Sequence, residues 1–301
     1  MPCQISRRSI LRIVACLAVT YMASSARAGE PVDIEYHEDV IYGAGDGEPL
    51  RLDWARPKKF DKPLTAIVYI HGGGWALGDK KGHRDEIKKA AREGFFSATV
   101  GYRLAPAHRF PAQVEDCKCA IRYLRANADE LGLDREKIGA IGFSAGAHLV
   151  MMLATMDAED GLEGKGGWPD WSSKIQAGVS FFGPTNLQSE FPERSQPLVN
   201  QFLDGTVESK PDAFRLASPI TYVNAGDAPL LMYQGTKDIL VPHDQAFQMI
   251  EALTAAGVPG RVEFLLGQGH GWRDPEAART FAGAIDFIVE QTSKSQQSAE
   301  K

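Results

Sequence analysis

The chain has little cysteine, no long apolar segment and no excess of positive charge. It carries four cysteines in 301 residues and a formal net charge of −6. So little cysteine excludes a disulfide-stapled scaffold. The acidic balance makes nucleic acid an unsuitable partner. What remains is an ordinary globular composition, 44% hydrophobic and 24% charged, with enough apolar material for a large core.

The N-terminus has the three parts of a signal peptide. Two adjacent arginines lie in residues 6–12, residues 13–22 are apolar, and Ala26-Arg27-Ala28 is typical of a cleavage site. We therefore predict a signal peptide at residues 1–28. The Arg7-Arg8 pair favours twin-arginine export, with general secretion as the alternative. The apolar run is too short to span a bilayer, so no stable membrane anchor is expected.

Removal of this segment would leave a more acidic chain with two cysteines. Cleavage after Ala28 removes four arginines and no acidic residue, so the formal charge moves from −6 to −10. Cys117 and Cys119 remain, and their spacing in a helical stretch points them to different faces, so no disulfide is expected between them. The expected location is the periplasm or the exterior of the cell.

The mature chain alternates between strand and helix patterns. Residues 33–57 alternate polar with apolar side chains, as half-buried antiparallel strands do. Apolar runs predict buried strands at residues 64–70, 95–102, 137–143, 175–182, 229–235 and 261–266. Helical periodicity predicts helices at residues 85–92, 113–131, 145–155, 244–256 and 275–291. This order indicates an α/β fold, a mostly parallel sheet with helices on both faces and the antiparallel N-terminal strands at one edge.

We predict one α/β domain over residues 29–292. Residues 184–227 contain several prolines and no strong period, with one short helix candidate at residues 198–203. We interpret this segment as a small cap insertion over the site. Residues 293–301 are polar and are expected to form a disordered tail.

One segment concentrates the chemistry: residues 142–146 read GFSAG and join a predicted strand to a predicted helix. A serine held out from a tight turn can reach a substrate carbonyl, and Gly142 and Gly146 keep side-chain atoms out of that turn. A serine here could also simply cap the following helix. The rest of the chain favours Ser144 as a nucleophile.

A serine nucleophile needs a base and a group that orients the base. Asp238 follows the strand at residues 229–235, and His270 follows the strand at residues 261–266. Both should therefore lie at the sheet edge that carries Ser144. We assign His270 as general base and then general acid, and Asp238 as the group that fixes the histidine tautomer. Taken alone, Asp238 would be better explained as a turn former.

The other histidines receive different roles. His148 lies one turn after Ser144 on its helix, so packing or hydrogen bonding is expected for it. His71 is expected to brace the loop that it begins. The remaining four are expected at the surface: His37, His83, His108 and His243.

Three backbone N–H groups are candidates for an oxyanion hole. Residues 71–75 read HGGGW directly after a predicted strand, and glycine lets the backbone of Gly73 and Gly74 approach a substrate closely. The N–H of Ala145, at the start of a helix, is the third. One such donor is worth about 10² to 10³ in turnover.

With these residues in place, the chain resembles the α/β-hydrolase superfamily. Within it, the chain is similar to the hormone-sensitive-lipase-type and the feruloyl- and acetyl-xylan-type (BD-FAE-like) esterases. The matching segments are HGGGW at 71–75, GDK at 78–80, YRLAP at 102–106, GFSAG at 142–146, GTKDILVP at 235–242 and GHGW at 269–272. The resemblance implies the α/β-hydrolase fold and ester hydrolysis through an acyl-serine, with no metal and no organic cofactor. It carries the catalytic roles onto the same triad and the same three donors.

Two departures favour the carbohydrate-esterase-like branch. The segment from residue 29 to 64 is shorter than the usual N-terminal cap of the lipase-type branch. The acid motif reads Gly235-Thr236-Lys237-Asp238 rather than D-P-L-x-D. Both departures point to an open pocket and count against long-chain lipids.

The leading hypothesis is an exported serine carboxylesterase for short-acyl, acetyl-type esters of small molecules or carbohydrate. An amide hydrolase of the arylformamidase or peptidase type would use the same triad. A non-catalytic binding protein on a hydrolase fold also stays open, although such proteins usually lose a triad member. Four tryptophans could either stack on a sugar or simply pack: Trp75, Trp168, Trp171 and Trp272. The sequence does not indicate the oligomeric state.

Overall fold

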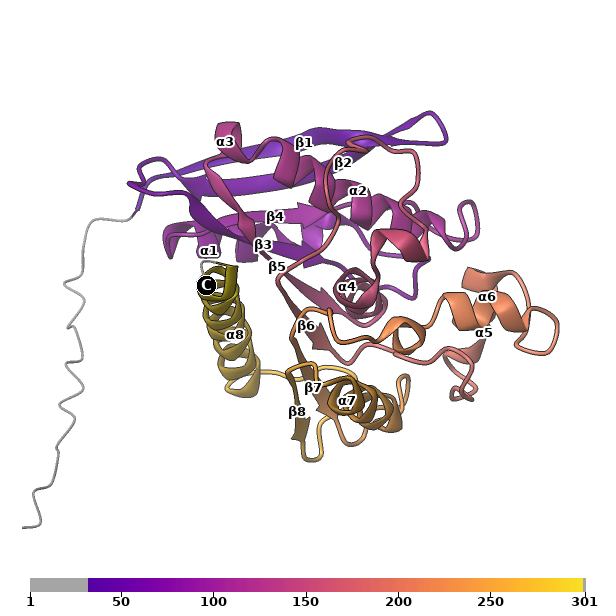
Figure 1. Cartoon of the computed structure of the whole chain (residues 1–301). Coiled ribbons are helices and arrows are strands. Elements are labelled where there is room, and N and C mark those ends of the chain that lie inside the picture. The colour runs from indigo at the N-terminus through magenta and orange to yellow at the C-terminus, as the bar shows by residue number, and fades with distance from the viewer. Residues whose placement is uncertain (1–31, 300–301) are drawn as a thin grey trace, which may run out of the picture. The chain divides into compact units, whose positions relative to one another are not determined.

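A single sheet organises the part of the chain that the structure describes (Figure 1). The computed structural model describes residues 32–299, so the predicted signal peptide lies outside the described residues. Within this range the sheet has eight strands in the order β1-β2-β4-β3-β5-β6-β7-β8. Their bounds are β1 Ile34–Gly45, β2 Glu48–Pro57, β3 Leu64–Ile70, β4 Phe96–Val100, β5 Leu133–Phe143, β6 Ala177–Phe181, β7 Leu230–Gly235 and β8 Gly260–Leu265.

The strand directions confirm the predicted mostly parallel sheet. β1 pairs antiparallel with β2, and β2 pairs antiparallel with β4. Every later neighbouring pair, from β4–β3 through to β7–β8, is parallel. The antiparallel strands therefore lie at one edge, as the alternating pattern of residues 33–57 indicates.

Helices cover both faces of this sheet. The helices are α1 Arg84–Arg92, α2 Ala112–Ala126, α3 Ala128–Leu131, α4 Ala145–Thr155, α5 Gln196–Leu203, α6 Pro211–Leu216, α7 Asp244–Ala256 and α8 Glu276–Ala299. Val68 of β3 shares a core with α2, α4 and α7, while its neighbour Tyr69 shares a second core with α1 and α8. Because adjacent side chains of a strand point to opposite faces, the two cores flank the sheet. In Figure 1, α4 and α8 accordingly lie on opposite sides of the central strands.

The last helix is longer than predicted. α8 runs to Ala299, past the predicted helix end at residue 291, and residues 300 and 301 lie outside the described residues. The reason is local, because this polar stretch contains no glycine or proline. Lys294 pairs with Glu290 one turn earlier at 2.6 Å, which supports the helix at this point.

The segment predicted as a cap insertion contains two short helices. α5 includes the predicted helix at residues 198–203, and α6 was missed because six residues carry too little periodicity. Within residues 32–299, no helix has both the length and the apolar character of a membrane span.

Candidate active site

Ser144 lies in a strained turn between β5 and α4. Its backbone has φ 53° and ψ −119°, a conformation that non-glycine residues rarely adopt. The flanking glycines leave the room that the turn needs. A Cβ on Gly142 would lie 2.3 Å from the carbonyl oxygen of Gly146, and one on Gly146 would lie 2.2 Å from that of Ile70. Any larger residue at either position would have to push the strand and helix apart.

The structure brings Ser144, His270 and Asp238 into one hydrogen-bonded chain. His270 Nε2 lies 2.9 Å from Ser144 Oγ, and His270 Nδ1 lies 2.7 Å from Asp238 Oδ2. A carboxylate only accepts hydrogen bonds, so Nδ1 carries the proton and Nε2 is free to accept the serine proton. These three residues come from the carboxyl ends of β5, β7 and β8, whose parallel directions place them at the same sheet edge.

Backbone and amide groups fix the Asp238 carboxylate. Its Oδ1 accepts from the N–H of Leu240 at 2.8 Å and of Val241 at 3.0 Å. Its Oδ2 also accepts from Gln234 Nε2 at 3.2 Å. The side chain is 0% exposed, so these bonds stand in for water and hold the carboxylate in one orientation toward His270. Sequence reasoning did not identify Gln234, which lies within the buried strand β7.

The glycine loop after β3 lies beside Ser144. Gly73 and Gly74 have φ angles of 112° and 58°, which favour glycine. A Cβ on Gly73 would lie 2.1 Å from the carbonyl oxygen of Leu77, and one on Gly74 would lie 2.9 Å from Leu198 of α5. Both glycines line the same pocket as Ser144, Ala145 and His270. The N–H groups predicted for the oxyanion hole therefore belong to one site.

His71 braces this loop, as its position indicates. Its ring is 5% exposed, stacks on Tyr102 with centroids 4.3 Å apart, and places Nδ1 2.8 Å from the carbonyl oxygen of Gly72. Burial lowers the pKa of His71, which favours the neutral ring. A Cβ on Gly78 would lie 2.4 Å from this Nδ1, so the glycine of the GDK segment makes room for the imidazole.

A buried ion pair anchors the other end of the loop. Lys80 and Asp53 are 5% and 0% exposed, and the ammonium group donates to the carboxylate. Arg84 donates to the second Asp53 oxygen at 2.7 Å. Burial opposes the charge on Lys80, but its bonds to Asp53 and Asp39 outweigh this effect and raise the pKa of Lys80. The sequence indicated the GDK segment but not Asp53, which lies 27 residues away on β2.

His148 links α4, the helix that follows Ser144, to two other parts of the site. Trp75 Nε1 donates to His148 Nδ1 at 3.1 Å, and His148 Nε2 lies 2.7 Å from the carbonyl oxygen of Ala217. Indole only donates, so Nε2 carries the imidazole proton. Burial lowers the pKa of His148 to about 4 and keeps the ring neutral. The expected packing and hydrogen-bonding role is confirmed.

His83 is not a surface residue, contrary to the sequence-based expectation. Its side chain is 15% exposed and stacks on Phe143 at 4.8 Å and on Tyr69 at 6.0 Å between centroids. Burial lowers its pKa to about 4. The prediction was wrong because its polar sequence neighbours do not reveal that the ring turns inward from the start of α1.

The pocket at Ser144 has a volume of about 430 Å³ and mainly apolar walls. The cap segment supplies part of the wall through Phe191, Leu198 and Val199. Leu77 is 70% exposed at this pocket. The remaining apolar side chains that line it are Trp75, Phe143, Phe182, Pro184, Leu240 and Val241.

Three of the four candidate stacking tryptophans pack within the protein. Trp75 is 3% exposed and stacks on Phe202 at 4.3 Å. Trp168 donates to the carbonyl oxygen of Tyr42 at 2.8 Å, and Trp272 donates to Thr280 at 2.9 Å. Trp171 instead lines a separate cavity, described below.

The chain is similar to one protein-family model and to several proteins named as esterases. The BD-FAE family model matches residues 52–253. Esterase LipC of Mycobacterium tuberculosis is 32% identical over 271 residues, which is 85% of this chain and 65% of LipC. Esterase LipQ of the same organism is 29% identical over 224 residues, 73% of this chain and 53% of LipQ. The chain thus spans about half to two thirds of the length of these relatives.

Two solved structures have the same architecture over most of the chain. A truncated form of a carbohydrate esterase from gut microbiota superposes with a TM-score of 0.76 at 25% identity, covering 88% of this chain and 99% of that one. The esterase Est2 of Thermogutta terrifontis, with propionate bound, gives a TM-score of 0.70 at 25% identity, covering 86% of this chain and 94% of that one.

Proposed function

Because the chain belongs to the BD-FAE family of α/β-hydrolases, we propose that it is a serine carboxylesterase acting on short-acyl esters. The observation that carries this proposal is the chain of contacts from Asp238 through His270 to Ser144 in a pocket bounded by Gly73 and Gly74. The relatives named as esterases support the same reaction class.

The proposed reaction starts with attack of Ser144 Oγ on the ester carbonyl carbon. His270 Nε2 takes the hydroxyl proton, and Asp238 stabilises the imidazolium that forms. The backbone N–H groups of Gly73, Gly74 and Ala145 stabilise the oxyanion of the tetrahedral intermediate. As the intermediate collapses, His270 protonates the leaving alcohol and an acyl-serine remains.

Water then hydrolyses the acyl-serine, and His270 again acts first as base and then as acid. His270 removes a proton from a water molecule that attacks the acyl-serine, and then returns that proton to Ser144 as the carboxylic acid leaves. Apart from the ester and the water molecule, every group that takes part in these steps belongs to the chain. The brace at His71 and the ion pair at Lys80 keep the oxyanion donors in place throughout, since they fix both ends of the glycine loop.

Several observations favour a short acyl group. Leu198 of the cap segment lies against Gly74 and lines the pocket, so it takes up space beside the glycine loop. Est2 of Thermogutta terrifontis has been solved with propionate and with butyrate bound. Ethyl acetate hydrolase of Pseudomonas putida is 33% identical over 135 residues, covering 44% of this chain and 42% of that protein.

A carbohydrate ester is the proposed natural substrate. The gut-microbiota structure described as a carbohydrate esterase supports this choice. We also propose export to the periplasm or beyond, which residues 1–28 support. Export is tested by N-terminal sequencing of the processed protein, where the account expects Gly29 first. Substitution of Arg7 and Arg8 by Lys should reduce processing if the twin-arginine route is used.

The acyl preference is tested with p-nitrophenyl esters of increasing chain length on the purified mature chain. The proposal predicts a steep fall in kcat/KM beyond about four carbons. A maximum at eight or more carbons would indicate a lipid-type pocket and contradict the short-acyl assignment. Turnover of p-nitroacetanilide but of no ester would favour the amide hydrolase, and no turnover at all would favour a binding protein.

A further inference from the structure

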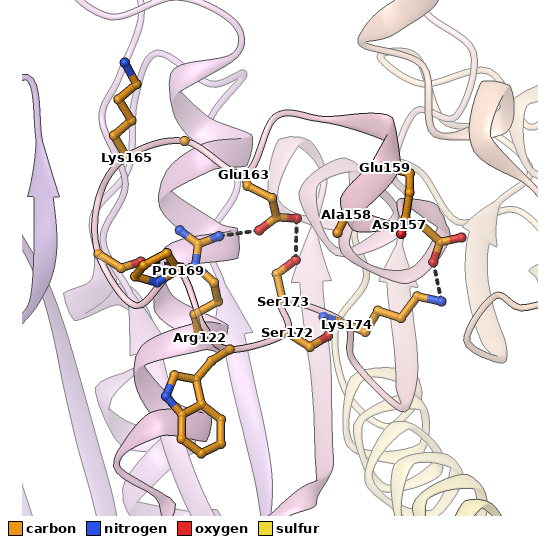
Figure 2. Close-up of a pocket in the computed structure, with 13 residues that line it drawn as sticks. Arg122, Asp157, Ala158, Glu159, Glu163, Lys165, Pro169, Ser172, Ser173 and Lys174 are labelled. Carbon is orange, nitrogen blue, oxygen red and sulfur yellow. Dashed lines mark hydrogen bonds and ion pairs between the residues drawn. The ribbon is translucent and has the colours of Figure 1, made fainter.

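The protein has a second cavity of about 590 Å³, and Figure 2 shows the residues that line it. The loop of residues 157–174, between α4 and β6, forms most of its wall, and Arg122 of α2 forms another part. This loop leads into the amino end of β6, whereas Ser144 follows the carboxyl end of the neighbouring parallel strand β5. None of the residues that line this cavity lines the pocket at Ser144.

Buried charges hold the loop in one conformation. Lys118 and Arg122 of α2 are 0% and 2% exposed, and both pair with Glu163 of the loop. Figure 2 shows Glu163 reaching both Arg122 and Ser173, which ties the two ends of the loop together. Arg125 donates to the carbonyl oxygens of two further loop residues. Breaking such a buried pair is costly, so the cavity is preorganised.

The loop also has features that are common at binding sites. Eighteen residues from 157 to 174 are a long connection for a compact domain, and loops of this length usually have a function. Leu162 and Trp168 have φ angles of 59° and 62°, which are strained for side chains of this size. The proposed ester hydrolysis uses none of these residues.

The walls of the cavity suit a neutral polyhydroxyl ligand. Trp171, which is partly exposed, lines it, and the guanidinium of Arg135 lies over its ring, 5.3 Å from the ring centroid. The charges are largely paired with each other, Lys174 with Asp157 and Arg122 with Glu163, so they provide no strong field to select an ion. The hydroxyl groups of such a ligand can donate hydrogen bonds to the carboxylates of the cavity and can accept them from its lysine and serine side chains.

We propose that this cavity binds a neutral saccharide segment of a polysaccharide, with Trp171 as its stacking platform. This inference rests on the proposed action on carbohydrate esters. A polysaccharide bound here stays attached to the enzyme while its acetylated sugar residues enter the pocket at Ser144. Binding therefore raises the local concentration of these esters at the pocket. The cavity therefore affects the use of polymeric substrates and not that of small esters.

Binding is measured by affinity electrophoresis in native gels that contain a soluble polysaccharide. The probes are deacetylated arabinoxylan and glucomannan, which are neutral, and polygalacturonate, which is anionic. The protein is the mature chain with Ser144→Ala, so that no substrate is turned over. We expect at least one neutral probe to retard it and polygalacturonate not to do so.

Trp171→Ala, introduced into the Ser144→Ala protein, should raise the apparent Kd for the retarding polysaccharide about tenfold, because the stacking face is lost. Trp171→Phe should restore most of the binding, and Phe247→Ala, an aromatic residue that is 47% exposed on α7, should change nothing. In the active enzyme, Trp171→Ala should leave kcat/KM for p-nitrophenyl acetate within twofold while raising KM for acetylated polymer.

Two results overturn the inference: no retardation by either neutral probe, or equal retardation with and without Trp171. Retardation only by polygalacturonate would also overturn it, because it would indicate a cation-lined anion site. The proposed function fails separately, through absence of ester turnover by the chain that retains Ser144. Turnover of p-nitrophenyl acetate without polysaccharide binding therefore removes the inference alone.

Discussion

The pocket at Ser144 and the cavity under residues 157–174 are stabilised by different interactions. Around Ser144, glycine contacts, backbone N–H groups and neutral imidazoles fix the groups, and the walls are apolar. At the cavity, ion pairs between side chains of α2 and Glu163 fix the loop of residues 157–174. Reaction chemistry at Ser144 needs donors aimed within a few tenths of an ångström, which the rigid backbone supplies. The loop of residues 157–174 carries no reacting group, so its ion pairs need only keep the wall of the cavity in place.

This difference predicts that changes to the reacting groups at the first site alter rate with little effect on stability, while changes to the ion pairs at the second alter stability with little effect on rate. The largest expected effect is that of Ser144→Ala. Turnover of p-nitrophenyl acetate should fall by roughly 10⁵- to 10⁶-fold, since the nucleophile is lost. The free energy of unfolding should change little, because alanine keeps the turn and removes a partly buried hydroxyl whose side-chain hydrogen bond is to His270. Unchanged turnover in this variant would contradict the mechanism.

Asp238→Asn should give the next largest loss, about 10⁴-fold in kcat. The amide keeps the shape but presents a donor as well as an acceptor to His270, which disfavours the required tautomer. Asp244→Asn, at the exposed start of α7, is the matched control and should retain full activity. Steady-state kinetics on both proteins make the comparison. A loss below tenfold would mean that Asp238 only forms the turn.

Glu163→Gln should lower the stability of the protein and leave its esterase activity nearly unchanged. Lys118 and Arg122 would lose their partner in a buried setting, so the free energy of unfolding should fall by about 2 to 4 kcal/mol. The lower part of this range is favoured because the Glu163 side chain is 29% exposed. Activity on p-nitrophenyl acetate in the folded protein should stay within twofold. Glu159→Gln, an exposed residue of the same loop, should change stability by less than about 0.5 kcal/mol in urea unfolding.

His148→Gln should produce the smallest effect, a change in the pH dependence of stability. Burial lowers the His148 pKa from 6.5 to about 4, so the unfolded chain binds the proton more readily in this interval. The contribution of the neutral ring is complete above about pH 6.5 and is lost as the pH falls toward 4. The unfolding free energy of the variant should therefore depend less on pH between 6.5 and 4, by about 2 to 3 kcal/mol.

His83 has the same shift and stays in both proteins, so the difference isolates His148. Parallel pH curves for the two proteins would show that His148 does not carry this proton linkage.

The sequence predicted the sheet and the residues that meet at its edge because both follow from local patterns. A buried strand followed by a polar loop fixes where Asp238 and His270 lie along their strands, and parallel strands then place both loops at one edge. The GFSAG and HGGGW segments likewise carry their backbone geometry in their glycines.

What the sequence did not show depends on partners far away in the chain. Lys118 pairs with Glu163 across 45 residues, and Lys80 pairs with Asp53 across 27. Periodicity assigns a charged residue to the surface, and only the packed structure shows that Lys118 is completely buried. The distal cavity, the burial of His83 and the full length of α8 were missed for related reasons, because each depends on contacts or on helix continuation that no motif indicates.

The most direct test of the account is mass spectrometry of the mature chain after reaction with paraoxon, which phosphorylates an activated serine. The account predicts one stoichiometric diethylphosphoryl adduct on the peptide that carries Ser144, formed in parallel with loss of esterase activity. The adduct should be absent in Ser144→Ala and should form much more slowly in Asp238→Asn. Full inactivation with the adduct on another residue, or continued hydrolysis with Ser144 fully modified, would contradict Ser144 as the nucleophile.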